Sequence, residues 1–159
     1  MRCRRGSLAS IASMSEAPRE PSDRPLPVSG SAPVPQAIAP NLFAVLGPEP
    51  FWRIARAFYA RIDRDAHLRP MFPADLEEPI RNQAEFLIQY FGGPQEYSMR
   101  KGHPRLRMRH MPFAIDVAAR NAWMACMRGA LEDAAIPEPH RGAMTAYFER
   151  TATFLINRD

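Results

Sequence analysis

The sequence contains little cysteine: Cys3 and Cys126 are the only two among 159 residues, and no CxxC pair occurs. A disulfide framework and a cysteine zinc site are therefore excluded. The sequence also lacks any run of about 18 apolar residues, so no membrane span is expected. The stretch from Leu8 to Ala12 is too short and too rich in serine for the apolar centre of a secretory signal. We expect a soluble cytoplasmic protein with no membrane partner.

A strong charge excess is also missing. The formal net charge is +4, and residues 1–40, with five arginines against three acidic residues, carry half of it. The excess left for residues 41–159 is too small to indicate a nucleic-acid partner, and we expect none. A basic helical protein that binds nucleic acid stays open as an alternative class of protein, which strongly salt-dependent binding would identify.

Proline is scarce outside one end of the chain, because nine of the 17 prolines fall within the first fifty residues. Residues 1–40 are rich in Pro, Ser and Ala and contain no aromatic residue. Such a segment cannot bury enough apolar surface to offset the entropy of ordering it. We therefore expect a flexible tail over residues 1–40 and one folded domain over residues 41–159.

The remaining pattern is helical, and no alternating strand pattern occurs. Apolar residues recur at three- and four-residue spacing in four stretches, which start after a proline or a capping aspartate: residues 48–63, 75–91, 116–131 and 139–155. Asp75 and Asp116 are the expected capping residues. Residues 94–114 lack a sustained period, so we expect a long loop that holds one short helical piece at about residues 104–110. A loop of this length usually carries function, and the class is all α.

Within that loop, the segment 102–113 reads GHPRLRMRHMPF. In a short helical piece Leu106 and His110 share one face, while Arg105 and Arg109 share another. Three arginines beside one imidazole suit a doubly anionic ligand that also needs a nitrogen donor. Haem fits this description, with two propionates and an open axial position on its iron. From composition alone, a solvated basic loop or a phosphate-binding patch is equally compatible with the segment.

Three polar side chains stand in otherwise apolar helix faces. Gln83 lies between Ile80 and Leu87 on a stripe expected to be buried, where an unpaired amide costs a few kcal/mol. It therefore indicates something polar to bind. Tyr59 and Trp123 occupy similar positions, although each alone is more often a core aromatic residue with one satisfied polar atom.

Six motifs together resemble the group II truncated haemoglobins, over about residues 44–157. They are Phe58-Tyr59, Phe72-Pro73, the QYFGGP of residues 89–94, Tyr97, the segment 102–113 and the AWMACM of residues 122–127. The arginine-rich run that ends in His110 is the most specific of them. The resemblance implies a truncated-globin fold, in which two antiparallel helix pairs cross over one another around haem b.

The resemblance also assigns roles to single residues. It implies that His110 ligates the haem iron and that Tyr59, Gln83 and Trp123 surround the ligand on the opposite, distal face. The other expected cofactor contacts are Tyr97, Arg105, Arg109, Phe72 and Phe86. A second histidine ligand, His67 or His103, is a minor alternative. His103 lies beside the expected propionate loop and not in the helices of the distal face.

Three positions depart from the family pattern. Phe72 replaces a tyrosine found in some members, so one hydrogen bond to the ligand is missing. Pro79 stands where a small or polar distal residue is usual. Asn82 stands where lysine is common, so a salt bridge to a propionate is lost unless another cation, such as Arg81, replaces it.

The implied function is binding of O₂, nitric oxide, carbon monoxide or peroxide in a polar distal pocket. Three hydrogen-bond donors predict slow O₂ release, which favours redox or detoxification chemistry on peroxide or nitric oxide over oxygen transport. A ligand-binding, storage or sensing globin without turnover needs the same pocket and stays open. Catalytic turnover would require an external electron donor, and a monomer or homodimer is expected.

Overall fold

Helices account for the regular structure between residues 41 and 159, the part of the chain that the computed structural model describes. Residues 1–40, for which the sequence predicts a flexible tail, lie outside the described residues. In chain order the elements are α1 (Leu42–Leu46), α2 (Glu49–Ile62), the 3-10 turn η2 (Arg69–Met71), α3 (Glu77–Tyr90), α4 (Glu96–Lys101), α5 (Leu106–His110), α6 (Val117–Asp133) and α7 (His140–Phe154). None of the helices within residues 41–159 has both the length and the apolar character that a membrane span requires.

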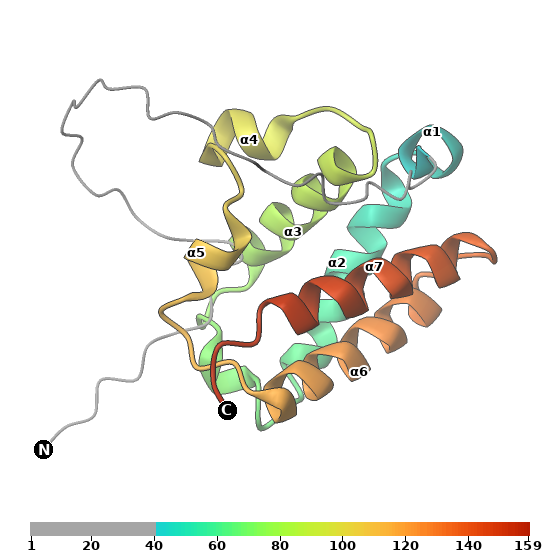
Figure 1. Ribbon diagram of the computed structural model, residues 1–159. Coiled ribbons are helices and arrows are strands. Elements are labelled where there is room, and N and C mark those ends of the chain that lie inside the picture. Colours follow the sequence, from blue (N-terminus) through green and yellow to red (C-terminus); the bar gives the residue numbers. More distant parts are fainter. Residues whose placement is uncertain (1–40) are drawn as a thin grey trace, which may run out of the picture.

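Two helix pairs form the body of the fold. Figure 1 shows α6 and α7 side by side, with α2 crossing behind them and with α3, α4 and α5 on the other side of α2. Helix α2 packs against both α3 and α6, and α6 packs against α7. The predicted all-α class is thus confirmed, and the pairs α2/α3 and α6/α7 cross as a two-over-two fold requires.

The long helices begin and bury their faces as their sequences predict. In α2, Pro50 stands in the first turn, and residues at helical spacing are completely buried, among them Phe51, Ile54 and Phe58. Asp116 caps α6 by accepting a hydrogen bond from the backbone N–H of Ala119 at 2.7 Å. These helices supply the core against which the shorter elements pack.

The prediction for the start of α3 is wrong by one residue. Leu76, not Asp75, is its N-cap, and the Asp75 carboxylate instead accepts a hydrogen bond from the backbone N–H of Glu77 at 3.0 Å. The side chain still satisfies an N–H of the first turn, so its physical role is the expected one.

The prediction of one helical piece in residues 94–114 is also incomplete, because two helices lie there. Helix α5 was expected, but α4 was not, since Tyr97 is the only buried residue among its six. Hydrogen bonds to α3 hold α4 in place: the Gln89 amide donates to the Ser98 hydroxyl at 2.7 Å and accepts from the Ser98 N–H at 3.0 Å. Arg105 has a φ of 42°, so the chain turns there and α5 begins at Leu106.

Candidate functional site

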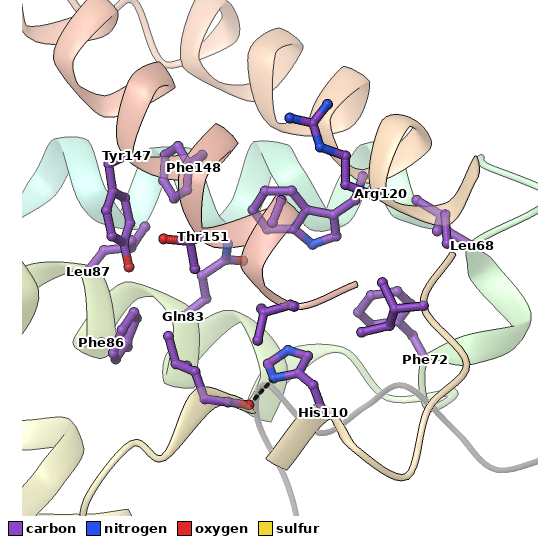
Figure 2. Close-up of a pocket in the computed structure, with 16 residues that line it drawn as sticks. Leu68, Phe72, Gln83, Phe86, Leu87, His110, Arg120, Tyr147, Phe148 and Thr151 are labelled. Atoms are coloured by element: carbon purple, nitrogen blue, oxygen red, sulfur yellow. Dashed lines mark hydrogen bonds between the residues drawn. The ribbon is translucent and has the colours of Figure 1, made fainter. Parts of the chain in front are cut away.

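A mostly apolar cavity opens between α3, α5, α6, α7 and the segment around η2. Its empty space, including open solvent at its mouth, amounts to about 830 Å³. Five of the residues predicted from the sequence line it: Phe72, Gln83, Phe86, His110 and Trp123. Figure 2 shows His110 and Gln83 on its walls, with the aromatic side chains of α7 facing them.

His110 is the last residue of α5 and is 4% exposed. Its Nδ1 lies 2.5 Å from the backbone oxygen of Leu106, whereas its buried Nε2 has no hydrogen-bond partner. Burial lowers the pKa of the imidazole, and the hydrogen bond to Leu106 acts in the opposite direction with smaller effect. The ring is therefore neutral, and since a carbonyl only accepts, Nδ1 carries the proton and Nε2 presents a lone pair to the cavity.

The backbone around His110 is tied to the end of the chain. The carbonyl of His110 accepts hydrogen bonds from the Phe113 N–H and from the Asn157 amide, both at 3.1 Å. The Asn157 side-chain oxygen in turn accepts from the Ile115 N–H at 3.0 Å. Arg107 donates to the Phe154 carbonyl at 3.0 Å. These contacts tie the backbone that carries the imidazole to the end of α7 and the residues after it.

On the opposite wall, polar atoms are buried without partners. The amide oxygen of Gln83, which is 3% exposed, has no hydrogen-bond partner, and neither has the hydroxyl of Tyr59. Burial raises the pKa of Tyr59, so its phenol is protonated. Tyr59 stands behind the lining: its ring meets the edge of Phe72 at a centroid distance of 5.8 Å. Trp123 packs between Phe58 and Phe148, at 5.1 and 5.9 Å.

The structure does not bring three of the predicted cofactor contacts to the cavity lining. Tyr97 is buried beside it and packs on the ring of Phe86 at 5.6 Å. Arg109 donates hydrogen bonds to the carbonyls of Lys101 and His103, and so braces the loop between α4 and α5. The side chain of Arg105 is exposed. Their contacts with propionates stay predictions.

Neither of the other histidines considered as a second ligand lines the cavity. His67 is exposed after α2, and His103 is exposed and accepts a hydrogen bond from the Arg105 N–H through Nδ1. Within residues 41–159, no cluster of three or more His, Cys, Asp or Glu side chains is arranged to hold a metal ion. His110 is thus the histidine that faces the cavity.

A buried carboxylate on α3 was not predicted from the sequence. Glu85, with a side chain 3% exposed, pairs with Arg81 at 2.7 Å and with Arg100 of α4 at 2.6 Å, and Arg100 also donates to Asn82. Burial by itself raises the pKa of Glu85, but the hydrogen bonds and charges of the two arginines outweigh it, so the pKa lies below its ordinary value. The ion pairs hold α4 against α3, and the Asn82 side-chain oxygen adds to this network by accepting the hydrogen bond from Arg100.

Two more polar residues that line the cavity come from α7. Tyr147 and Thr151 stand one turn apart, and the Thr151 hydroxyl lies within hydrogen-bonding reach of the Tyr147 phenol. Their polar ends are directed toward the same part of the cavity as Gln83 (Figure 2). The sequence carried a weak signal for Thr151, which falls on the expected apolar stripe of residues 139–155, and none for Tyr147.

These features fit the haem that the sequence predicts. Apolar walls suit a flat macrocycle, and an unpaired imidazole nitrogen suits an axial position on iron. The hydrogen bond from Nδ1 to Leu106 is the outer-shell contact that ligating histidines commonly make. The unpartnered oxygens of Tyr59 and Gln83 leave hydrogen-bonding capacity for a ligand on the other face.

Comparisons with known proteins give one family. The pattern of the bacterial-like globins matches residues 41–157. Group 2 truncated hemoglobin YjbI of Bacillus subtilis is 36% identical over 116 residues, covering 73% of this chain and 88% of that protein.

Solved structures agree with this result. The hemoglobin of the thermophilic phototrophic bacterium Chloroflexus aurantiacus is 49% identical, with a TM-score of 0.72 over 75% of this chain and 99% of that one. The group II truncated hemoglobin of Bacillus anthracis is 35% identical, with a TM-score of 0.71 over 74% of this chain and 96% of that one.

Proposed function

This chain belongs to the bacterial-like globin family and, within it, to the group II truncated haemoglobins, and from that premise we propose that it reduces peroxides with electrons from an external donor. As a member of the family it is a haem b protein that binds diatomic ligands such as O₂. The reaction, a cytoplasmic location and a monomeric or dimeric state belong to the proposal.

When bound, haem would supply an iron that takes up an external ligand and exchanges single electrons with it. His110 would hold the iron through Nε2, and the hydrogen bond from its Nδ1 to Leu106 makes Nε2 more basic. Trp123 has an indole N–H that can only donate, whereas Tyr59 and Gln83 can donate and accept.

The observation that carries the proposal is the buried amide oxygen of Gln83, which has no partner. An acceptor oxygen is satisfied by a group that brings a hydrogen-bond donor, so a ligand that binds it must carry one. O₂, nitric oxide and carbon monoxide bring none, but hydrogen peroxide brings two O–H groups. The Gln83 amide therefore favours peroxide over nitric oxide, the other redox substrate that the sequence predicts.

The test is the rate of the haem-loaded protein with hydrogen peroxide. Gln83→Leu is expected to lower the bimolecular rate constant about tenfold, the equivalent of one hydrogen bond to the ligand. Carbon monoxide binding should change much less, because that ligand donates nothing to the amide. Gln95→Leu is the matched control, since Gln95 is exposed at the start of α4. Equal peroxide rates in parent and Gln83→Leu would contradict the proposal, as would a parent protein that binds O₂ but leaves peroxide unconsumed.

A further inference from the structure

Two tyrosines connect the cavity with the protein surface. Tyr147 lines the cavity from α7 and is 7% exposed (Figure 2). Tyr90, at the end of α3, is 46% exposed. Their rings stack with a centroid distance of 4.1 Å and an interplanar angle of 29°. One phenol thus faces the cavity, and the phenol stacked on it faces solvent.

This pair differs from every other aromatic contact in residues 41–159. Each of the others includes a phenylalanine; Trp123, for example, packs on Phe58 and Phe148, and Tyr97 packs on Phe86. Phenol and indole rings lose an electron far more readily than a benzene ring does. Within the described part of the chain, Tyr147 and Tyr90 are therefore the only two oxidisable rings in direct contact.

Packing alone does not require two hydroxyls at this position. Phe91 already packs edge-on against both rings, at 5.0 and 5.5 Å, so the surrounding cluster is apolar. A phenylalanine in place of Tyr147 would fill the same volume without placing a polar atom in the cavity wall. The hydroxyl of Tyr147 thus requires an explanation other than core formation.

We propose that Tyr147 and Tyr90 form an electron path from the surface to the haem cavity, which lets a phenolic donor reduce the site without entering it. The proposal rests on the peroxide reaction above. The donor would bind against the exposed ring of Tyr90, and Tyr147 would deliver the electron inside. Transfer between stacked rings is fast because electron tunnelling falls steeply with distance.

The electrons reach the peroxide in two identical one-electron transfers. Reduction of hydrogen peroxide to two waters takes two electrons and two protons. In each transfer Tyr147 gives one electron and its proton to the cavity, where reduction of the peroxide consumes both, and it is restored by an electron from Tyr90 and a proton from solvent through the open mouth of the cavity. Tyr90 then releases its proton to solvent and takes a hydrogen atom from the donor phenol. Overall, one peroxide and two phenols yield two waters and two phenoxyl radicals.

The first test omits the donor, so that the oxidation remains on the protein. The haem-loaded chain is mixed with hydrogen peroxide, peroxide consumption is followed, and oxidised residues are located by spin trapping and peptide mass spectrometry. The variants are Tyr90→Phe and Tyr147→Phe. Trp52→Phe is the control, because Trp52 is an oxidisable ring on α2 that contacts the guanidinium of Arg56 instead of another ring.

We expect the trapped radical at Tyr90 in the parent and in Trp52→Phe. Tyr147→Phe should reduce that product about tenfold while peroxide is still consumed, because the stacked ring remains but no longer passes the electron. If peroxide is consumed and the radical forms elsewhere, or if Tyr147→Phe leaves the Tyr90 product unchanged, the electron path is wrong and the peroxide reaction stands. If peroxide is not consumed, both proposals fail.

The second test adds a donor too large for the cavity, a phenol coupled to a soluble polymer. Tyr90→Phe is expected to lower the steady-state rate with this donor about tenfold and to leave the rate with free phenol nearly unchanged, since free phenol can reach the haem directly. Tyr90→Leu removes the stacked ring from an exposed position and serves as a second variant with the fold intact. Equal rates with the coupled donor in parent, Tyr90→Phe and Tyr90→Leu would overturn the proposal.

Discussion

The two sides of the cavity differ in whether their polar groups have hydrogen-bond partners in the protein. On the proximal side, around α5, the His110 ring nitrogen Nδ1, its carbonyl and the neighbouring Arg107 and Arg109 all have protein partners. On the distal side, around α2, α3 and α6, Tyr59 and Gln83 keep polar atoms without partners. The protein thus fixes the side expected to hold the cofactor and leaves the side expected to meet the ligand unsatisfied.

The difference has an energetic consequence. A hydrogen bond within the protein contributes about 1 kcal/mol, whereas a buried polar atom left unpaired costs about 1–3 kcal/mol. Substitutions on the proximal side should therefore reduce stability or haem retention. Substitutions on the distal side that remove an unpaired polar atom should change ligand kinetics without reducing stability, and can raise it. The predictions below test this division, in order of decreasing effect.

His110→Ala should have the largest effect, because it removes the one histidine nitrogen that faces the cavity. Haem affinity is expected to fall by more than about a hundredfold, since loss of an outer-shell partner alone costs roughly 10–100-fold. The axial-ligand absorption spectrum should also change. His67→Ala is the control, because His67 is exposed. Stoichiometric haem with an unchanged spectrum in His110→Ala would assign the axial position to another residue.

Glu85→Gln should cost about 1–2 kcal/mol of unfolding free energy at pH 7, because it removes the charge of a buried carboxylate whose partner Arg100 stays partly exposed to solvent. The folded pKa of Glu85 is lowered, so this stabilisation is fully present above the ordinary glutamate value of about 4.3 and is lost as the pH falls through the folded value. The difference between parent and variant should therefore shrink in acid.

Denaturant titrations at pH 7 and below pH 4 measure this difference. Glu49→Gln is the matched control: Glu49 pairs with Arg56, but both side chains are more than half exposed, so a change below about 1 kcal/mol is expected. A difference between parent and Glu85→Gln that stays constant with pH would exclude the ionised carboxylate as its source.

Much of this division could be predicted from local sequence, and the remainder could not. The end of α5 at His110, the cap at Asp116 and the burial of Gln83 follow from spacing and from neighbouring prolines. The contacts that local sequence does not reveal are long-range: Asn157, which binds the His110 carbonyl, lies 47 residues from it, and Arg100, which pairs α4 with α3, lies 15 residues from Glu85. Helix α4 was not predicted because hydrogen bonds to α3 hold it in place, and its own sequence carries no apolar stripe.

Trp123→Phe is expected to speed O₂ dissociation by roughly ten- to a hundredfold, since it removes a donor and keeps most of the aromatic volume. Tyr59→Phe should act in the same direction, and the double variant should depart from additivity if both belong to one hydrogen-bond network. Because the rings of both residues contact Phe58, unfolding free energies are needed beside the rates. Stopped-flow O₂ dissociation rates in Trp123→Phe that stay within about twofold of the parent would mean that Trp123 is a core residue and does not contact the ligand.

Asn157→Ala should have the smallest effect and is the most direct probe of the proximal side, because Asn157 touches the backbone of His110 and not its ring. The variant loses the hydrogen bond to the His110 carbonyl and the one from the Ile115 N–H. Only the bond to the His110 carbonyl bears on the haem, and at about 0.5–1.5 kcal/mol its loss should make haem dissociation faster by roughly two- to tenfold. If Asn157 only holds the backbone in place, faster haem dissociation is the only effect expected.

If Asn157 orients the imidazole, the iron–histidine stretching frequency should shift as well. Asn157→Asp separates the two bonds, since its carboxylate still accepts from Ile115 but repels the His110 carbonyl. It should shift the frequency at least as far as Asn157→Ala does. Asn121→Ala, at an exposed position of α6, should leave both measurements unchanged. A faster haem loss with an unshifted frequency would mean that Asn157 holds the end of the chain in place without orienting His110.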